Sequence, residues 1–272
     1  MCTTCLMNDV KARMLNRRDL LRGAGAAGVA AATASFAAPA ALAQGHGTVE
    51  DLTYELTEDF PTFFGDQQFF VERKFDVVTD GFNLFELRVN EHTGTHVDAP
   101  LHFSADGLSV AEIPVANLVV PLVVIDIRGK TEADPDAQVT PDDIAAFIAA
   151  NGELPVRACV AMLSGWQAHF GTPKFRNADD AGAMHFPGFH VEAVQMLMDQ
   201  TSAVGIASDT LSLDHGPSPD FAAHYAWLPS NRWGIECIAN LDRLPPLGAT
   251  LIVGAPKHRG GSGGPARILA LV

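Results

Sequence analysis

An alternating apolar pattern runs into a histidine-rich segment in the stretch Phe82-Asn-Leu-Phe-Glu-Leu-Arg-Val-Asn-Glu-His-Thr-Gly-Thr-His-Val-Asp98. In its first half, Leu87 and Val89 alternate with the polar residues Glu86 and Arg88. Successive side chains of a strand point to opposite faces, so this alternation predicts a β-strand over residues 82–89. We expect a buried strand that delivers the following histidines to a fixed position.

The second half of the stretch carries the side chains of a metal site. His92, His96 and Asp98 supply nitrogen and oxygen donors that suit zinc, manganese or iron. Gly94 and Pro100 disfavour a helix here, which favours a strand end that turns into a loop. His96 and Asp98 then alternate onto one side of an extended segment. Three ligands make an incomplete coordination shell, so further donors are expected elsewhere.

The rest of the chain predicts an α/β fold with a mixed sheet as its core. Short apolar runs predict further strands at 119–127, 158–163, 203–207, 251–253 and 268–272. One helix is predicted to begin after the N-cap residue Thr140, with Pro141 in its first turn, and to end at Asn151-Gly152. A second is predicted from about His190 to Met198. We find no linker within residues 44–272, which predicts a single domain.

The first 43 residues have the pattern of an export signal. Arg17 and Arg18 precede an Ala/Gly-rich apolar run, Gly23–Ala43, which ends in an Ala-Leu-Ala cleavage pattern. The run is too weakly hydrophobic to predict a membrane anchor. Paired arginines with a mild apolar core favour twin-arginine export of a folded protein to the periplasm. The alternative is an N-terminal tail with little order.

Charge and cysteine content narrow the classes of function. The net charge is −14, although the first 43 residues hold five basic against two acidic residues, so the remainder is strongly acidic. Such a body repels phosphate backbones, which excludes nucleic acid as a partner. Cys2 and Cys5 precede the predicted cleavage site. Cys159 and Cys237 lie in apolar runs, which favours two buried thiols over a disulfide.

Further candidate ligands lie near the C-terminus. His224 and Glu236 are twelve residues apart, and the flanks of Glu236 are apolar. A carboxylate in such surroundings needs a cation or a hydrogen-bond donor, because a lone buried charge is costly. From the residues alone, metal ligation and simple hydrogen bonding are equally supported. His215 and Asp209 are rival candidates for the same role.

With these residues in view, the chain resembles the cyclase family of metal-dependent hydrolases, which includes bacterial kynurenine formamidase and isatin hydrolase. The family signature H-x-G-T-H-x-D-x-P-x-H stands complete as His92-Thr-Gly-Thr-His-Val-Asp-Ala-Pro-Leu-His102. The resemblance implies a compact single-domain β/β/α fold, a dimer or higher homo-oligomer, and one or two divalent ions per site. The site residues that it implies are His92, His96 and Asp98 for a first metal, His224 and Glu236 with Asp98 for a second, and His102 as the catalytic acid/base.

The expected activity is hydrolysis of an amide-type bond with a metal-activated water. The substrate would be an aryl formamide such as N-formylkynurenine, or a lactam such as isatin, and the metal zinc or manganese. Two alternatives remain: a cyclisation or lyase reaction on the same site, and a non-catalytic periplasmic metal-binding protein. The export signal differs from many cytoplasmic members and argues against a role in tryptophan breakdown. Ser164 lacks the G-x-S-x-G context of a serine hydrolase.

Aromatic residues offer a candidate substrate slot. The set comprises Phe60, Phe63, Phe64, Phe69, Phe70 and Trp166, with Trp166 as the predicted substrate-binding residue. The stronger interpretation of the phenylalanines is that they form core or dimer contacts. The glycine-rich segment Gly260–Gly264 lacks the Lys-Ser/Thr ending of a phosphate loop and predicts a flexible turn.

Overall fold

The computed structural model describes residues 47–272. The predicted export segment, with Arg17, Arg18, Cys2 and Cys5, lies outside this range. The described chain divides into two compact units, one of Glu72–Glu86 and the other of residues 47–71 and 87–272. Within the described residues, no helix has both the length and the apolar character needed to cross a membrane.

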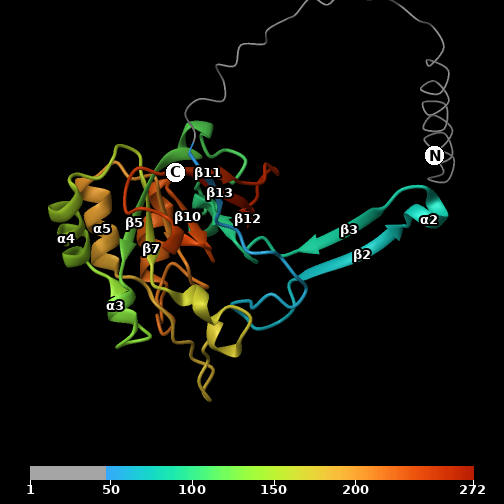
Figure 1. Cartoon of the computed structure of the whole chain (residues 1–272), viewed down its shortest axis with the longest axis horizontal. Helices are drawn as coiled ribbons and strands as arrows, with labels where there is room; N and C mark the ends of the chain where they lie inside the picture. The colour runs from blue at the N-terminus through green and yellow to red at the C-terminus, as the bar shows by residue number, and fades with distance from the viewer. Residues whose placement is uncertain (1–46) are drawn as a thin grey trace, which may run out of the picture. The chain divides into compact units, whose positions relative to one another are not determined.

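The larger unit is built on a mixed β-sheet, as expected from the sequence. Among the described residues nine strands form it, in the order β1-β13-β11-β5-β7-β9-β10-β4-β12 (Figure 1). Strands β5, β7, β9 and β10 are parallel, and the strands towards both edges are antiparallel. The strands are β1 Val49–Asp51, β4 His96–Asp98, β5 Val119–Asp126, β7 Cys159–Leu163, β9 Gly205–Ser208, β10 Trp233–Glu236, β11 Thr250–Gly254, β12 Gly263–Pro265 and β13 Arg267–Leu271.

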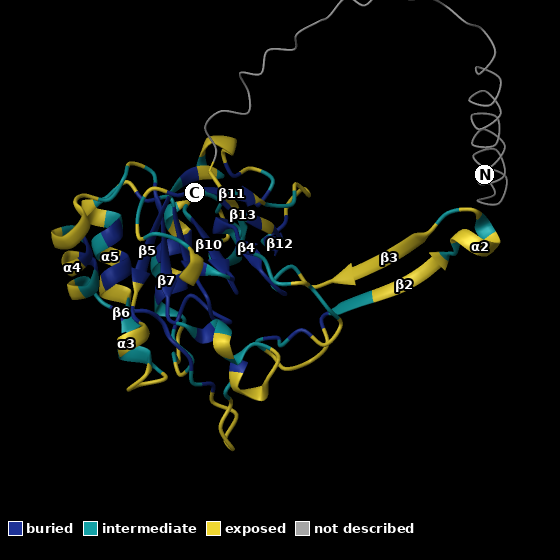
Figure 2. Cartoon of the chain, in the orientation of Figure 1, coloured by how far each residue is buried: buried dark blue, intermediate teal, exposed yellow. Residues whose placement is uncertain are grey.

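The central strands are continuous apolar runs because both faces of the sheet are covered. Every residue of β7 and of β9 is buried (Figure 2). On one face, Phe147 of α4 (Pro141–Asn151) and Leu197 of α5 (Val191–Gln200) pack onto the sheet. A second apolar cluster, which includes Leu122, fills the other face. Cys159 and Cys237 are both buried and free, so the predicted pair of thiols is confirmed.

The two predicted helices are confirmed, and their ends follow the expected capping chemistry. Thr140 and Asp143 form a capping box at the start of α4, and Gly152 ends it with a positive φ of 91°. The remaining helices are short: α2 Val77–Asp80, α3 Arg128–Thr131, α6 Ala222–Trp227 and the 3₁₀ turns η3 Pro100–His102, η4 Val115–Asn117, η5 Trp166–His169, η6 Pro173–Phe175, η7 Leu228–Ser230 and η8 Leu241–Arg243. A small two-stranded sheet joins β6 (Gln138–Val139) to β8 (Gly188–Phe189).

The strand predicted at residues 82–89 is present as β3 (Leu84–Val89), but it is not buried. It pairs with β2 (Phe69–Phe75) in a separate two-stranded sheet, and all its residues are exposed (Figure 2). The expectation of a buried strand that ends at the metal site was therefore wrong. Alternation specifies a strand and its two faces, but not which layer covers them. The strand that carries the histidines into the large sheet is β4.

Candidate metal centre and active site

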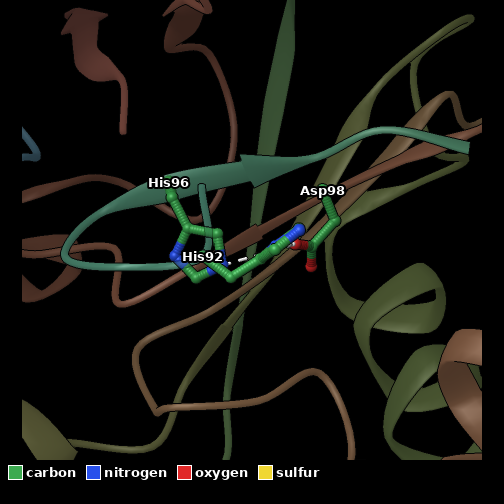
Figure 3. A group of neighbouring side chains, drawn as sticks. All are labelled: His92, His96 and Asp98. Atoms are coloured by element: carbon green, nitrogen blue, oxygen red, sulfur yellow. Dashed lines mark hydrogen bonds and ion pairs between the residues drawn. The ribbon is translucent and has the colours of Figure 1, made fainter. Parts of the chain in front are cut away.

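The pairing of β4 with β10 brings one imidazole and two carboxylates to one place. It lies between β10 and β12, all three of its residues are buried, and His96 is paired with Glu236 of β10. Because side chains alternate along a strand, His96 and Asp98 emerge on the same face of β4 (Figure 3). The sheet register thus places His96, Asp98 and Glu236 together without any loop having to hold them.

His92 reaches the same face from the loop that precedes β4. Gly94, with a φ of +72°, turns the chain there, and an added Cβ would lie 2.8 Å from Leu56 Cδ1. The turn sets His92 Nδ1 2.7 Å from Asp98 Oδ1 (Figure 3). His92, His96 and Asp98, here called the first donor group, offer ligand atoms that all lie within 4.8 Å of one another.

Buried polar atoms of the first donor group lack hydrogen-bond partners. His96 Nδ1 donates to the Gly94 carbonyl over 2.8 Å, which leaves its Nε2 directed at Asp98 Oδ1 (3.3 Å) and Glu236 Oε2 (3.4 Å). Among the described residues, neither His96 Nε2 nor Asp98 Oδ2 has a hydrogen-bond partner. Buried polar atoms are almost always satisfied. A divalent cation would satisfy both, so these residues fit a metal ion.

A second donor group shares Asp98 with the first. It consists of Asp98, His224 of α6 and Glu236 of β10, again with ligand atoms within 4.8 Å of one another. His224 Nε2 lies 3.0 Å from Glu236 Oε1 and 3.6 Å from Asp98 Oδ2. His224 Nδ1 lies 2.6 Å from Asp214 Oδ2, and Asp214 also accepts from two backbone N–H groups. Asp214 therefore orients the ring of His224 so that Nε2 faces the other donors.

The electrostatics of the cluster favour a bound cation. Burial alone would raise the pKa of Asp98, but the charge of His96 and the close imidazoles of His224 and His92 outweigh it and hold the pKa well below its usual value. Burial and the neighbouring Asp98 charge raise the pKa of Glu236. Two carboxylates this close and this buried need positive charge between them. A bound metal ion would supply that charge.

His102 lies beside the metal-binding residues but belongs to neither donor group. Its ring, on η3, stacks on His92 with a centroid separation of 3.7 Å and an interplanar angle of 17°. Burial and the neighbouring histidines lower the pKa of His102 to about 4, against the opposing effect of Asp98. Its imidazole is therefore neutral at neutral pH and has a lone pair that can accept a proton.

A cavity of about 300 Å³ opens onto both donor groups. His92, His96, His102, His224 and Glu236 form its polar side, and its aromatic wall is formed by Phe63, Phe64, Phe103 and Phe221. The rings of Phe103 and Phe221 lie 5.8 Å apart, and so do those of Phe63 and Phe221. The metal-binding side chains and an apolar surface therefore face each other across a space that suits a small aromatic molecule.

Only part of the predicted aromatic slot occurs at this cavity. Phe63 and Phe64 line it, whereas Phe60 is packed in an apolar cluster with Trp166. Trp166 is 1% exposed, its Nε1 donates to the Phe175 carbonyl, and it is not among the residues that line the cavity. Phe69 and Phe70 lie on β2. Phe103 and Phe221 were not predicted, because the signature marks only their neighbours.

The rival candidates, Asp209 and His215, belong to neither donor group. Asp209 accepts the Ser164 hydroxyl over 2.5 Å and the backbone N–H groups of Gly165 and Trp166. Ser164 is 3% exposed and does not line the cavity, so it is not placed as a nucleophile. Sequence reasoning missed Asp214, Ser262, which contacts His92, and Glu91, which contacts Ser262. Ser262 falls in the glycine-rich segment predicted to be only a flexible turn.

Comparison with known proteins agrees with this site. Residues 50–215 match the Cyclase family, described as “Putative cyclase”. The chain is 37% identical over 194 residues to an isatin hydrolase of Roseibium aggregatum, which covers 68% of this chain and 73% of that protein. It is 28% identical over 185 residues to a kynurenine formamidase of Salinibacter ruber, covering 68% and 78%. The solved isatin hydrolase A of Ralstonia solanacearum superposes with a TM-score of 0.79 at 35% identity, covering 90% of this chain and 100% of that one.

Fold, donor groups and relatives together define a metal-dependent hydrolase that acts on amide C–N bonds. The chain belongs to the cyclase family. The predicted mixed α/β fold and the predicted family are thus both confirmed.

The orphaned nitrogen of His96 leads to a test of metal binding. His96→Ala should abolish tight binding of zinc and should remove the rise in melting temperature that zinc gives the wild type, because a ligand that binds only the folded state stabilises it. Elemental analysis and thermal unfolding, each with and without added zinc, measure the two effects. His215→Ala is the matched control and should bind zinc as the wild type does. Full zinc content in His96→Ala would remove His96 from the ligand set.

Proposed function

We propose that this chain hydrolyses the amide bond of a small aryl substrate, either an aryl formamide such as N-formylkynurenine or a lactam such as isatin. The observation that carries the proposal is the placement of His102. It lines the cavity beside two metal-binding groups, but it belongs to neither of them. The names of the relatives, isatin hydrolase and kynurenine formamidase, support this substrate class.

Three imidazoles and two carboxylates would hold the cation, and this donor set suits zinc or manganese. When bound there, a divalent ion lowers the pKa of a coordinated water and polarises a carbonyl oxygen. We propose two ions per site, since there are two donor groups and Asp98 belongs to both. Metal analysis of the wild type gives the count: two ions per chain support the proposal, and one contradicts it.

The residues of the chain supply the proton transfers and the binding surface. His102, neutral because of its low pKa, takes a proton from the attacking water and returns it to the leaving nitrogen. Its stacking on His92 keeps the imidazole at the edge of the donor groups. Phe63, Phe103 and Phe221 would contact the aryl ring, and their apolar surface would exclude bulk water from the reacting carbonyl.

The alternatives receive less support. A passive metal-binding protein needs ligands, but it has no use for a neutral imidazole that faces a cavity and is not itself a ligand. A cyclisation or lyase reaction could use the same groups, but no feature of the site favours it over hydrolysis, and the relatives named isatin hydrolase and kynurenine formamidase are hydrolases.

Replacement of His102 separates proton transfer from metal binding. His102→Ala should keep its zinc and its fold but lose about 100- to 10,000-fold in turnover, the range for a positioned acid/base group. Turnover of isatin and N-formylkynurenine, metal content and circular dichroism measure these properties. His215→Ala again serves as the control and should retain its turnover. Loss of zinc would make His102 a ligand, and near-normal turnover would exclude it from the reaction.

We further propose that the protein acts in the periplasm after twin-arginine export. Support comes from the sequence pattern of residues 1–43, with Arg17-Arg18 ahead of the apolar run. Changing both arginines to lysine should leave folded, active protein in the cytoplasm, as measured by cell fractionation. Arg13→Lys with Arg22→Lys conserves charge outside the pair and should export normally. Normal export of the Arg17/Arg18 variant would exclude the twin-arginine route.

We also propose that the mature chain forms a homodimer or a higher homo-oligomer. The two-stranded sheet of β2 and β3 exposes apolar side chains, including Leu87 at 60% and Phe85 at 45%. A lone two-stranded sheet is marginally stable, and contiguous exposed apolar surface is typical of interfaces. A second copy of the chain is therefore the proposed cover for these strands.

The assembly can be tested on the same residues. Phe85→Ser with Leu87→Ser should shift the sedimentation coefficient to that of a monomer, because the interface would lose its apolar contacts. Val115→Ser is the control, since Val115 is 76% exposed but lies on η4, away from these strands in the sequence. A wild-type protein that sediments as a monomer at micromolar concentration would contradict the proposal.

A further inference from the structure

The ring of His92, a member of the first donor group, is held by Ser262, and Ser262 is held in turn by Glu91. His92 Nε2 lies 3.0 Å from the hydroxyl of Ser262, which is 170 residues later in the sequence. The Ser262 hydroxyl donates to Glu91 Oε2 over 2.6 Å, and the Ser262 backbone N–H donates to the same oxygen over 3.2 Å. His258 Nε2 contacts the other oxygen of Glu91. Glu91, Ser262 and His92 thus form a series of hydrogen-bonded groups that ends at His92.

Ser262 has little freedom to move. Its carbonyl accepts from the Ala99 N–H over 2.8 Å, and the next residue begins β12, which pairs with β4. A Cβ on Gly263 would lie 2.7 Å from His92 Cε1, so the backbone of β12 closely approaches the ring. The same sheet register that places Asp98 therefore also places Ser262 behind His92.

The direction of the hydrogen bonds follows from the chemistry of the groups. An ionised carboxylate only accepts, so the single hydrogen of the Ser262 hydroxyl points to Glu91. Ser262 Oγ can then only accept from His92, so the His92 ring carries a hydrogen on Nε2. The nitrogen that remains for a cation is Nδ1, which lies 2.7 Å from Asp98 Oδ1.

We propose that Glu91 and Ser262 are positioning residues that select the tautomer of His92, so that its Nδ1 binds the cation. The proposal rests on the proposed metal site and adds to it which nitrogen binds and which residues enforce that choice. Asp214 provides a parallel at His224, where a carboxylate lies against Nδ1 and leaves Nε2 for the donor group. His92 and His224 would therefore bind a cation through different ring nitrogens, His92 through Nδ1 and His224 through Nε2.

The variants that test this are Ser262→Ala, Glu91→Ala and Glu91→Gln. Without the hydroxyl or the carboxylate, nothing fixes the hydrogen on Nε2, so we expect zinc affinity to fall about 10- to 100-fold, the usual effect of losing such a partner. Glu91→Gln should recover most of the loss, since its amide oxygen can still accept the Ser262 hydroxyl. Chelator competition measures the affinity. Nitrogen-15 spectra of zinc-loaded, histidine-labelled wild type should show zinc on Nδ1 and hydrogen on Nε2 of His92.

A matched pair in the same chain controls for general loss of a Glu–Ser contact. Ser109 donates its hydroxyl to Glu112 over 2.6 Å and its N–H over 2.9 Å, and neither residue contacts a histidine. Ser109→Ala and Glu112→Ala should therefore bind zinc with wild-type affinity. Unfolding midpoints of the chelator-treated proteins show that each variant is folded.

Three outcomes would overturn the inference: zinc on Nε2 of His92, wild-type affinity in Ser262→Ala, or a Glu91→Gln variant no better than Glu91→Ala. These three outcomes can be distinguished from a failure of the proposed function. If the wild type itself binds no zinc, the metal site is wrong, whatever the behaviour of the variants.

Discussion

The burial of Asp98 within a sheet is the constraint on which the rest of the site depends. Its side chain is 0% exposed, and one carboxylate oxygen lacks a hydrogen-bond partner among the described residues. An ionised group in that position is tolerated only if positive charge is close, because the cost of removing a carboxylate from water is several kcal/mol or more. The neighbouring imidazoles and a bound cation would meet that requirement. Because β4 lies between β10 and β12, it cannot turn the Asp98 carboxylate out to solvent. The need for nearby positive charge therefore remains.

Around this carboxylate, hydrogen bonds leave each histidine with one nitrogen for the metal. The Gly94 carbonyl occupies one nitrogen of His96, and Asp214 occupies one nitrogen of His224. Such partners hold the rings in place and reduce the ordering that would otherwise accompany metal binding. The donor groups are therefore largely preorganised. The chemistry of the centre is set as much by these outer contacts as by the ligands themselves.

The residues that bind the metal and the residues that form the apolar wall of the cavity lie mostly on different elements. Strands and the turn before β4 hold the metal-binding residues except His224, which lies on α6, and loops and short helices carry Phe63, Phe103 and Phe221 of the opposite wall. Loops tolerate sequence change better than buried strands do. His102 lies at the boundary, on a 3₁₀ turn directly after β4, close enough to stack on His92.

The sequence by itself determined the local features of this protein. The apolar runs predicted the central strands, Thr140 and Pro141 predicted the start of α4, and the spacing of His92, His96 and Asp98 indicated a metal site. These succeed because short-range periodicity and capping act over a few residues. The residues alone named His224 and Glu236 as candidates beside the rivals His215 and Asp209, and the family resemblance selected them; the structure brings both beside Asp98.

Only the tertiary structure decided which surfaces are covered and which distant residues meet. It left β3 exposed, although its alternation predicted a buried strand, and it placed Trp166 in the core away from the cavity. It also brought Ser262 behind His92 from 170 residues away. A pattern of side chains fixes the two faces of an element, but the partner of each face is chosen by sheet order and register, and these arise from packing of the whole chain.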